Sequence, residues 1–139
     1  MISTKGRYAV RILVDLAENG EGTKRAIPLK DIAQRQEISE KYLQRIAKAL
    51  VKAGMIVGTS GKGGGYRLAR PAADMPISEV LEAAEGTFAP VACLAPGAVP
   101  CERADQCKTL AMWERYDALS HSFFGSVTVR DVSEGSFSV

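Results

Sequence analysis

The stretch from residue 39 to residue 54 constrains the fold most, because its apolar residues recur with the spacing of one face of an α-helix. Ser39 can cap the start of such a helix, and Gly54 can take the left-handed conformation that ends it. The predicted buried stripe consists of Leu43, Ile46, Ala47, Leu50 and Val51. The residues off that stripe are polar or basic, namely Lys41, Gln44, Arg45, Lys48 and Lys52. We therefore expect a helix with one buried face and one basic face.

The segments on either side of this helix predict two further helices before it and a β-hairpin after it. A first helix is expected up to about residue 20, and Pro28 opens a short second helix. Two strand-like runs, at 55–57 and 66–69, enclose the glycine-rich segment 58–65. Helix, turn, helix and hairpin follow one another as in a winged helix-turn-helix domain. We therefore predict a mainly α fold with a small β-hairpin wing.

The second half of the chain reads as a linker helix, an irregular loop and a longer helix. Ser78 is placed to cap a helix that runs to about residue 86, and three prolines between residues 90 and 100 predict irregular backbone. A helical pattern returns from Cys107, followed from about Val127 by a short capped turn or helix and a tail. Its apolar seam suits packing against a helix of a second copy or, alternatively, against the chain's own core. The seam consists of Met112, Tyr116, Leu119 and Phe123.

Charge also divides the chain into two halves, although the net charge is only +2. Up to Arg70 there are 14 Lys and Arg against 6 Asp and Glu, and beyond it there are 4 against 10. A basic half favours a polyanionic partner, with a merely solvated surface as the alternative. We accordingly divide the chain into a winged helix-turn-helix DNA-binding domain at 1–72, a linker helix and cysteine loop at 73–106, and a dimerisation helix with a C-terminal tail at 107–139.

Double-stranded DNA is the polyanion that suits the predicted helix, because the major groove admits an α-helix. Lys41 and Gln44, near the start of the helix, are the candidates for reading base edges. The other candidate DNA-binding residues are Ser39, Tyr42, Arg45 and Lys48 on the helix and Lys62 and Arg67 on the wing. Alternatively, the same two helices and hairpin could bind another protein instead of DNA. A phosphate-binding P-loop is excluded, since Lys62 is followed by Gly63 and not by Ser or Thr.

Three cysteines, Cys93, Cys101 and Cys107, fall within the predicted irregular loop. An odd number of cysteines argues against a disulfide framework and favours metal or redox chemistry. Their spacings, seven and then five intervening residues, lack the close ligand pairs of a structural zinc site. Thiolates suit iron–sulfur clusters, and a purely redox-active set of thiols or unliganded cysteines are the alternatives. His121 stands too far along the predicted helix to join the three thiols within one chain.

Three motifs resemble the IscR-type family of regulators, and the resemblance extends over essentially the whole chain. The motifs are Ser3-Thr4-Lys5-Gly6-Arg7-Tyr8-Ala9-Val10, Ile38-Ser39-x-x-Tyr42-Leu43 and Gly61-Lys62-Gly63-Gly64-Gly65-Tyr66-Arg67-Leu68. The resemblance implies a winged-helix homodimer joined by the helix after the cysteine loop and a palindromic DNA operator. It also implies an iron–sulfur cluster, of two or four irons, with Cys93, Cys101 and Cys107 as metal ligands.

The chain departs from the family pattern at three positions that affect this chemistry. Leu110 stands where members of the family have a histidine as the fourth ligand, and Tyr8 stands where nitric-oxide-sensing relatives have an aspartate. The candidates for the fourth ligand are therefore Glu102, Asp105, the N-terminal helix of a partner chain or a small molecule. Gln44 stands where the family often has glutamate, so the family's operator sequence does not transfer to this chain.

These features together predict a non-enzymatic transcriptional regulator, expected to act as a repressor. It would sense cluster status, iron, or redox and nitrosative stress through its iron–sulfur cluster. The alternatives are a thiol-based or zinc-dependent regulator of cysteine and sulfur metabolism without a cluster, or a cluster-carrier protein. One histidine and no nucleophile motif leave no candidate active site. No apolar run is long enough for a membrane span and the N-terminus does not resemble a secretory signal, so we expect a cytoplasmic protein.

Overall fold

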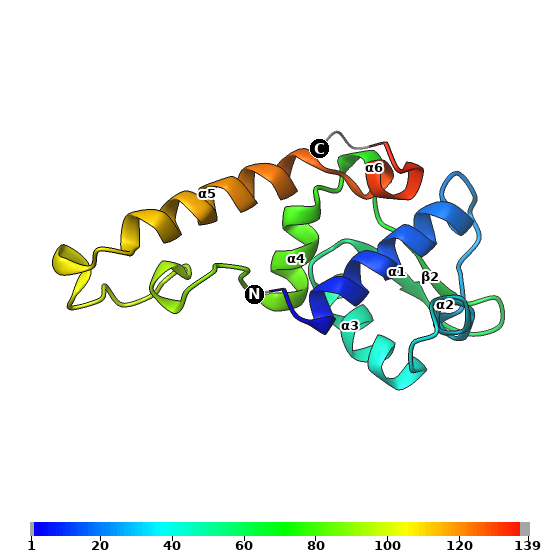
Figure 1. Cartoon of the computed structure of the whole chain (residues 1–139). Helices are drawn as coiled ribbons and strands as arrows, with labels where there is room; N and C mark the ends of the chain where they lie inside the picture. The colour runs from blue at the N-terminus through cyan, green and yellow to red at the C-terminus, as the bar shows by residue number, and fades with distance from the viewer. Residues whose placement is uncertain (1, 137–139) are drawn as a thin grey trace.

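The computed structural model describes residues 2–136 and shows a mainly helical chain with one small hairpin (Figure 1). In chain order the elements are α1 (Thr4–Gly20), α2 (Leu29–Gln36), α3 (Glu40–Lys52), β1 (Ile56–Thr59), β2 (Gly65–Leu68), α4 (Ile77–Glu85), α5 (Leu110–Ser126) and α6 (Val129–Glu134). Short 3-10 turns lie at Ala72–Asp74, Ala92–Leu94 and Ala104–Gln106. The mainly α fold with a hairpin wing, predicted from the sequence, is confirmed. The end of the predicted C-terminal tail, residues 137–139, lies outside the described residues.

The hydrophobic core lies around α1, against which α2, α3, α4 and α6 pack (Figure 1). Ile12 of α1 and Leu50 of α3 are fully buried in this one core, and so is Val129 of α6. Two backbone hydrogen bonds fasten the C-terminal end to the start of α4: Ile77 N donates to the Val127 carbonyl at 2.8 Å, and Val129 N to the Met75 carbonyl at 2.9 Å. The chain therefore returns to the helical body after α5.

Two local predictions were wrong, and both have a physical explanation. Val51 was expected in the buried stripe of α3 but is 42% exposed, because it lies at the edge of that stripe beside the wing. Ser78 was expected to cap α4, but the helix begins at Ile77 after Pro76, and no side chain caps it. Pro76, in an extended conformation, takes the N-cap position, and the carbonyl of Val127 accepts the hydrogen bond of the Ile77 amide at this helix start.

The cysteine loop (residues 87–109) runs outward from α4, and helix α5 returns alongside it to the body (Figure 1). Along its whole described length α5 has no buried residue. Its apolar seam, predicted from the sequence, lies in the open, with Met112, Tyr116, Leu119 and Phe123 between 45% and 57% exposed. Among residues 2–136, no helix is both long and apolar enough to cross a membrane.

Candidate nucleic-acid interface

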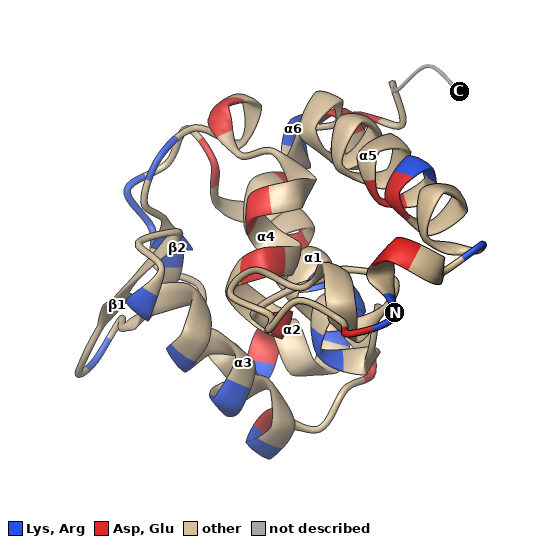
Figure 2. Cartoon of the chain, turned by 90° about the vertical axis from the view of Figure 1, so that its left-hand side faces the viewer, with Lys and Arg blue, Asp and Glu red and all other residues tan. Residues whose placement is uncertain are grey.

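Helix α3 presents the predicted basic face to solvent. The Ser39 hydroxyl caps the helix by accepting a hydrogen bond from Tyr42 N at 3.2 Å, as predicted. Leu43 and Leu50 are fully buried, which fixes the rotation of the helix about its own axis. The opposite face is exposed and carries Lys41, Gln44, Arg45 and Lys48. Figure 2 shows lysine and arginine gathered along α3 and the hairpin, whereas the labelled stretch of α4 carries acidic residues.

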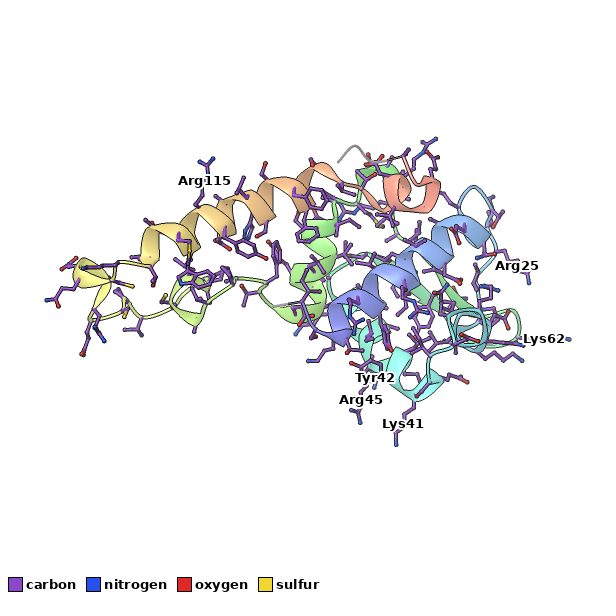
Figure 3. The ribbon with its side chains drawn as sticks, viewed as in Figure 1. Arg25, Lys41, Tyr42, Arg45, Lys62 and Arg115 are labelled. Carbon is purple, nitrogen blue, oxygen red and sulfur yellow. The ribbon has the colours of Figure 1, made fainter. Side chains whose placement is uncertain are left out.

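Tyr42 packs against α1, whereas its basic neighbours on α3 point into solvent. Its ring is half-buried and meets the ring of Tyr8 on α1 edge to face, with centroids 5.6 Å apart. The guanidinium of Arg11 lies 5.3 Å from the centre of the same Tyr8 ring. Figure 3 shows Tyr42 at the lower edge of the molecule, between α1 and the outward-pointing Lys41 and Arg45.

A buried carboxylate, which the sequence analysis missed, holds the helix before α3 in place. Asp15 on α1 is 1% exposed and accepts hydrogen bonds from Arg35 Nε at 3.0 Å and Arg35 Nη2 at 2.7 Å. Gln36 Nε2 donates to the same carboxylate at 2.9 Å, and Arg11 donates to Gln36 in turn. The hydrogen bonds to Asp15 raise the pKa of Arg35 above its ordinary value. The only sequence signal was a charged residue between Val14 and Leu16, inside the apolar face of a helix.

The wing is a two-stranded antiparallel hairpin in which Val57 pairs with Arg67. Tyr66 also exchanges two backbone hydrogen bonds with Ile27, each 2.8 Å long, which ties β2 to the segment before α2. Gly65 permits this approach, because a Cβ there would collide with the Ile27 backbone, and its φ of +145° is rarely adopted by other residues. Lys62 at the tip and Arg67 on β2 are both exposed, and Figure 3 shows Lys62 pointing outward.

A second missed residue, Glu85, fastens the end of α4 to the start of α1. One carboxylate oxygen of Glu85 accepts hydrogen bonds from Ser3 N at 2.7 Å, Ser3 Oγ at 2.6 Å and Gly6 N at 2.9 Å. Partial burial alone would raise the pKa of Glu85, but these hydrogen bonds outweigh it and lower the pKa below its ordinary value. Gly86 and the cysteine loop follow directly, so Glu85 joins the start of α1 to the segment that leads into that loop.

The three cysteines are free thiols, and all of them are exposed. Among residues 2–136, the structure brings no three His, Cys, Asp or Glu side chains into an arrangement that holds a metal ion. The Cys107 sulfur lies 3.4 Å from Thr109 Oγ1, and this hydrogen bond lowers the pKa of the Cys107 thiol. No residue from 89 to 109 is buried, so little core packing opposes a rearrangement of the loop. The chemistry of three accessible thiols therefore fits an iron–sulfur cluster, but their positions are not yet those of ligands.

The other side chains considered as ligands are not gathered around the cysteines either. Glu102 and Asp105 are exposed in the same loop. His121 stacks on Phe88 with ring centroids 4.4 Å apart, and its Nδ1 lies 3.0 Å from the Asp117 carbonyl oxygen. It therefore packs on the segment that leads into the loop. Leu110, at the start of α5, offers no donor atom.

Comparisons with known proteins agree with this arrangement over nearly the whole chain. A family model described as "Rrf2: Iron-dependent Transcriptional regulator" matches residues 2–135. The protein rrf2 of Nitratidesulfovibrio vulgaris is 37% identical over 131 residues, which cover 94% of this chain and 85% of that protein. The HTH-type transcriptional regulator IscR of Cereibacter sphaeroides is 38% identical over 133 residues, covering 94% of this chain and 85% of that one.

Solved structures show the same fold. CymR, described as the global cysteine regulator of B. subtilis, superposes with a TM-score of 0.77 at 29% identity, over 97% of each chain. IscR of T. potens superposes with a TM-score of 0.76 at 28% identity, over 99% of this chain and 88% of that one. Of these similar proteins, CymR of B. subtilis and IscR of Cereibacter sphaeroides are named as regulators.

Proposed function

The chain belongs to the Rrf2 family of transcriptional regulators, and on that premise we propose that it is a repressor whose affinity for DNA depends on an iron–sulfur cluster held by its cysteine loop. The observation that carries the proposal is the exposed basic face of α3 beside a basic wing, in a chain whose three free thiols are exposed in a stretch, 89–109, without a buried residue. Its expected compartment is the cytoplasm, and the three parts 1–72, 73–106 and 107–139 are its proposed domains.

DNA recognition is assigned to α3 and the wing. Lys41 and Gln44 are exposed near the start of α3 and are proposed to read base edges in the major groove. Backbone phosphates would be held by Ser39, Tyr42, Arg45 and Lys48 from α3 and by Lys62 and Arg67 from the wing. The hydroxyl of Ser39 already caps the helix, so its share in phosphate binding is the smallest of this set.

A second copy of the chain is proposed to cover the open side of α5. A helix of 17 residues without a buried side chain gains little stability by itself, and its apolar seam needs a surface to pack against. Phe123 of that seam also lines an apolar groove of about 480 Å³, together with Tyr8 of α1 and Val132 of α6. Two copies related by a two-fold axis would cover both surfaces at once and would present two α3 helices to a palindromic operator.

The cysteine loop is the proposed sensing element. When bound, the cluster supplies iron that reacts with oxygen, nitric oxide or chelators. Cys93, Cys101 and Cys107 would hold it, and Glu102 or Asp105 of the same loop, or a group from the partner chain, would complete the ligand set. Glu85 joins the start of this loop to α1, so a rearrangement of the loop would change which conformations of the DNA-binding body are populated.

One specific observation favours a second candidate function, a thiol-based regulator of cysteine or sulfur metabolism. The hydrogen bond from Thr109 stabilises the thiolate of Cys107, which is the reactive form of cysteine. The similarity to the global cysteine regulator of B. subtilis points to the same candidate. In this case the protein would respond to oxidants without iron.

The experiment that tests the main proposal is a DNA titration under anaerobic conditions. A palindromic duplex obtained by random-site selection is titrated with cluster-loaded protein, with chelator-treated protein and with the triple variant Cys93→Ala, Cys101→Ala, Cys107→Ala. We expect an affinity that differs at least tenfold between the loaded and the cluster-free forms, and a triple variant that behaves as the cluster-free form. Equal affinities of all three forms would contradict control by a cluster.

A further inference from the structure

The segment that connects α1 to α2, residues 21–26, carries two exposed cations beside the wing. They are Lys24 and Arg25. Arg25 points outward at the same edge of the molecule as Lys62 of the wing tip (Figure 3). Arg115, in contrast, projects from α5 on the far side of the body (Figure 3).

Hydrogen bonds give this segment a defined shape. Thr23 donates to the Gly20 carbonyl through its amide at 3.1 Å and through its hydroxyl at 2.8 Å. The same hydroxyl accepts the Arg25 amide at 3.3 Å. Two residues further along, Ile27 is held to Tyr66 of β2 by the paired backbone hydrogen bonds described above. These hydrogen bonds therefore fix the position of the Arg25 backbone relative to the wing.

The charges of the segment are available for an anion. Its only acidic residue, Glu21, uses its carboxylate to accept the Ala72 amide at 3.0 Å. Among the residues that the structure describes, neither Lys24 nor Arg25 takes part in an ion pair. A hollow of about 260 Å³ is lined by residues 20–23, directly before Lys24, and by Arg67 of β2 and Arg70, so the segment and the base of the wing border the same space.

We infer that residues 21–26 form a further DNA-contacting element, in which Lys24 and Arg25 bind backbone phosphates next to those held by the wing. The inference rests on the proposed DNA-binding function and extends its footprint. Phosphate is the expected anion because residues 21–26 continue the basic surface of α3 and the hairpin. Exposed lysine and arginine side chains neutralise DNA phosphates without distinguishing between base sequences. The contact would lengthen each half-site without adding specificity.

The test compares Lys24→Gln/Arg25→Gln with wild type and with Arg115→Gln, a control that removes one positive charge from α5, away from the segment. Binding is measured from 50 to 300 mM salt on the selected palindrome with long flanks and on a duplex trimmed at its outer ends. On the long duplex we expect the double variant to bind roughly tenfold more weakly, with a slope of log affinity against log salt lowered by about two per chain. On the trimmed duplex, wild type and double variant should converge.

The outcomes separate this inference from the proposed function. If the double variant binds the long duplex like Arg115→Gln while Lys48→Ala still weakens binding, the inference is overturned and the segment faces a different partner, such as an acidic protein surface. If the double variant weakens binding equally on both duplexes, the flanking phosphates are not its target, which also overturns the inference. If wild-type protein binds no duplex in a salt-dependent way, the proposed function fails together with the inference.

Discussion

The carboxylate of Asp15 in the middle of α1 accepts two hydrogen bonds from the guanidinium of Arg35 on α2, at 3.0 and 2.7 Å. Asp15 is 1% exposed, whereas the Arg35 side chain is 39% exposed. The carboxylate of Asp15 is therefore desolvated, whereas the guanidinium of Arg35 stays partly hydrated. Since α2 leads directly into α3, the angle between these two helices and α1 depends on this contact.

This difference in burial predicts that replacing Arg35 destabilises the fold more than replacing Asp15. Arg35→Met leaves the buried Asp15 carboxylate without its cation and should lower the free energy of unfolding by about 3–5 kcal/mol. Asp15→Asn leaves a guanidinium that water can still reach, and should cost about 1–3 kcal/mol. Urea denaturation followed by circular dichroism measures both, with Arg115→Met as the exposed control. Equal, small losses for the two variants would show that the pair does not hold the helices.

A pH-dependent contribution is expected from Glu85, whose pKa is lowered in the folded protein by hydrogen bonds from Ser3 and Gly6. A carboxyl group with a depressed folded pKa stabilises the fold above its unfolded pKa, and that stability is lost as the pH falls through the folded pKa. Glu85→Gln should therefore lower Tm at pH 7 but much less near pH 3. Glu82→Gln, at an exposed position of the same helix, is the control. Parallel Tm curves for wild type and Glu85→Gln across this range would refute the assignment.

Lys48 is predicted to contribute affinity without specificity, because it lies on the exposed face of α3 beyond the first turn. Lys48→Ala should weaken binding to all duplexes by a similar factor and lower the salt slope by about one per chain. Fluorescence anisotropy on the selected palindrome and on an unrelated duplex measures this, with Lys108→Ala in the cysteine loop as control. A loss confined to the palindrome would make Lys48 a base-reading residue instead.

Gln44 is predicted to read a base, since it is exposed one turn into α3 and its amide can pair with adenine N6 and N7. Gln44→Glu should shift the preferred base towards a cytosine contact, by about 1–3 kcal/mol at one base pair in each half-site. Random-site selection with both proteins provides the measurement. An unchanged selected sequence would remove Gln44 from the set of readers.

The sequence predicted those parts of the fold whose causes lie within a few residues. Ser39 caps α3 through Tyr42, three residues away, and Pro28 precedes α2 directly. The wing followed from its glycines and the flanking apolar runs. Such signals need no knowledge of which segments meet in three dimensions.

The parts that the sequence did not reveal are contacts between distant segments. Glu85 binds Ser3 across 82 positions and Asp15 binds Arg35 across 20, so neither pair leaves a local pattern. Val51 continued the apolar repeat, but the wing beside it covers only part of its side chain. For the cysteines, sequence and structure supply the same three exposed thiols, and among residues 2–136 the structure brings no three possible metal ligands together.

The most direct test of the account is the iron and acid-labile sulfide content of the protein, purified and reconstituted without oxygen and measured together with its visible absorption. We predict a coloured protein with iron and sulfide in the ratio of a two-iron or four-iron cluster. Each of Cys93→Ala, Cys101→Ala and Cys107→Ala should bleach it, and Leu110→His, which adds a nitrogen donor at the start of α5, should preserve or strengthen the signal. A wild-type protein that binds stoichiometric zinc but never iron and sulfide would contradict the account and leave a zinc or thiol switch in its place.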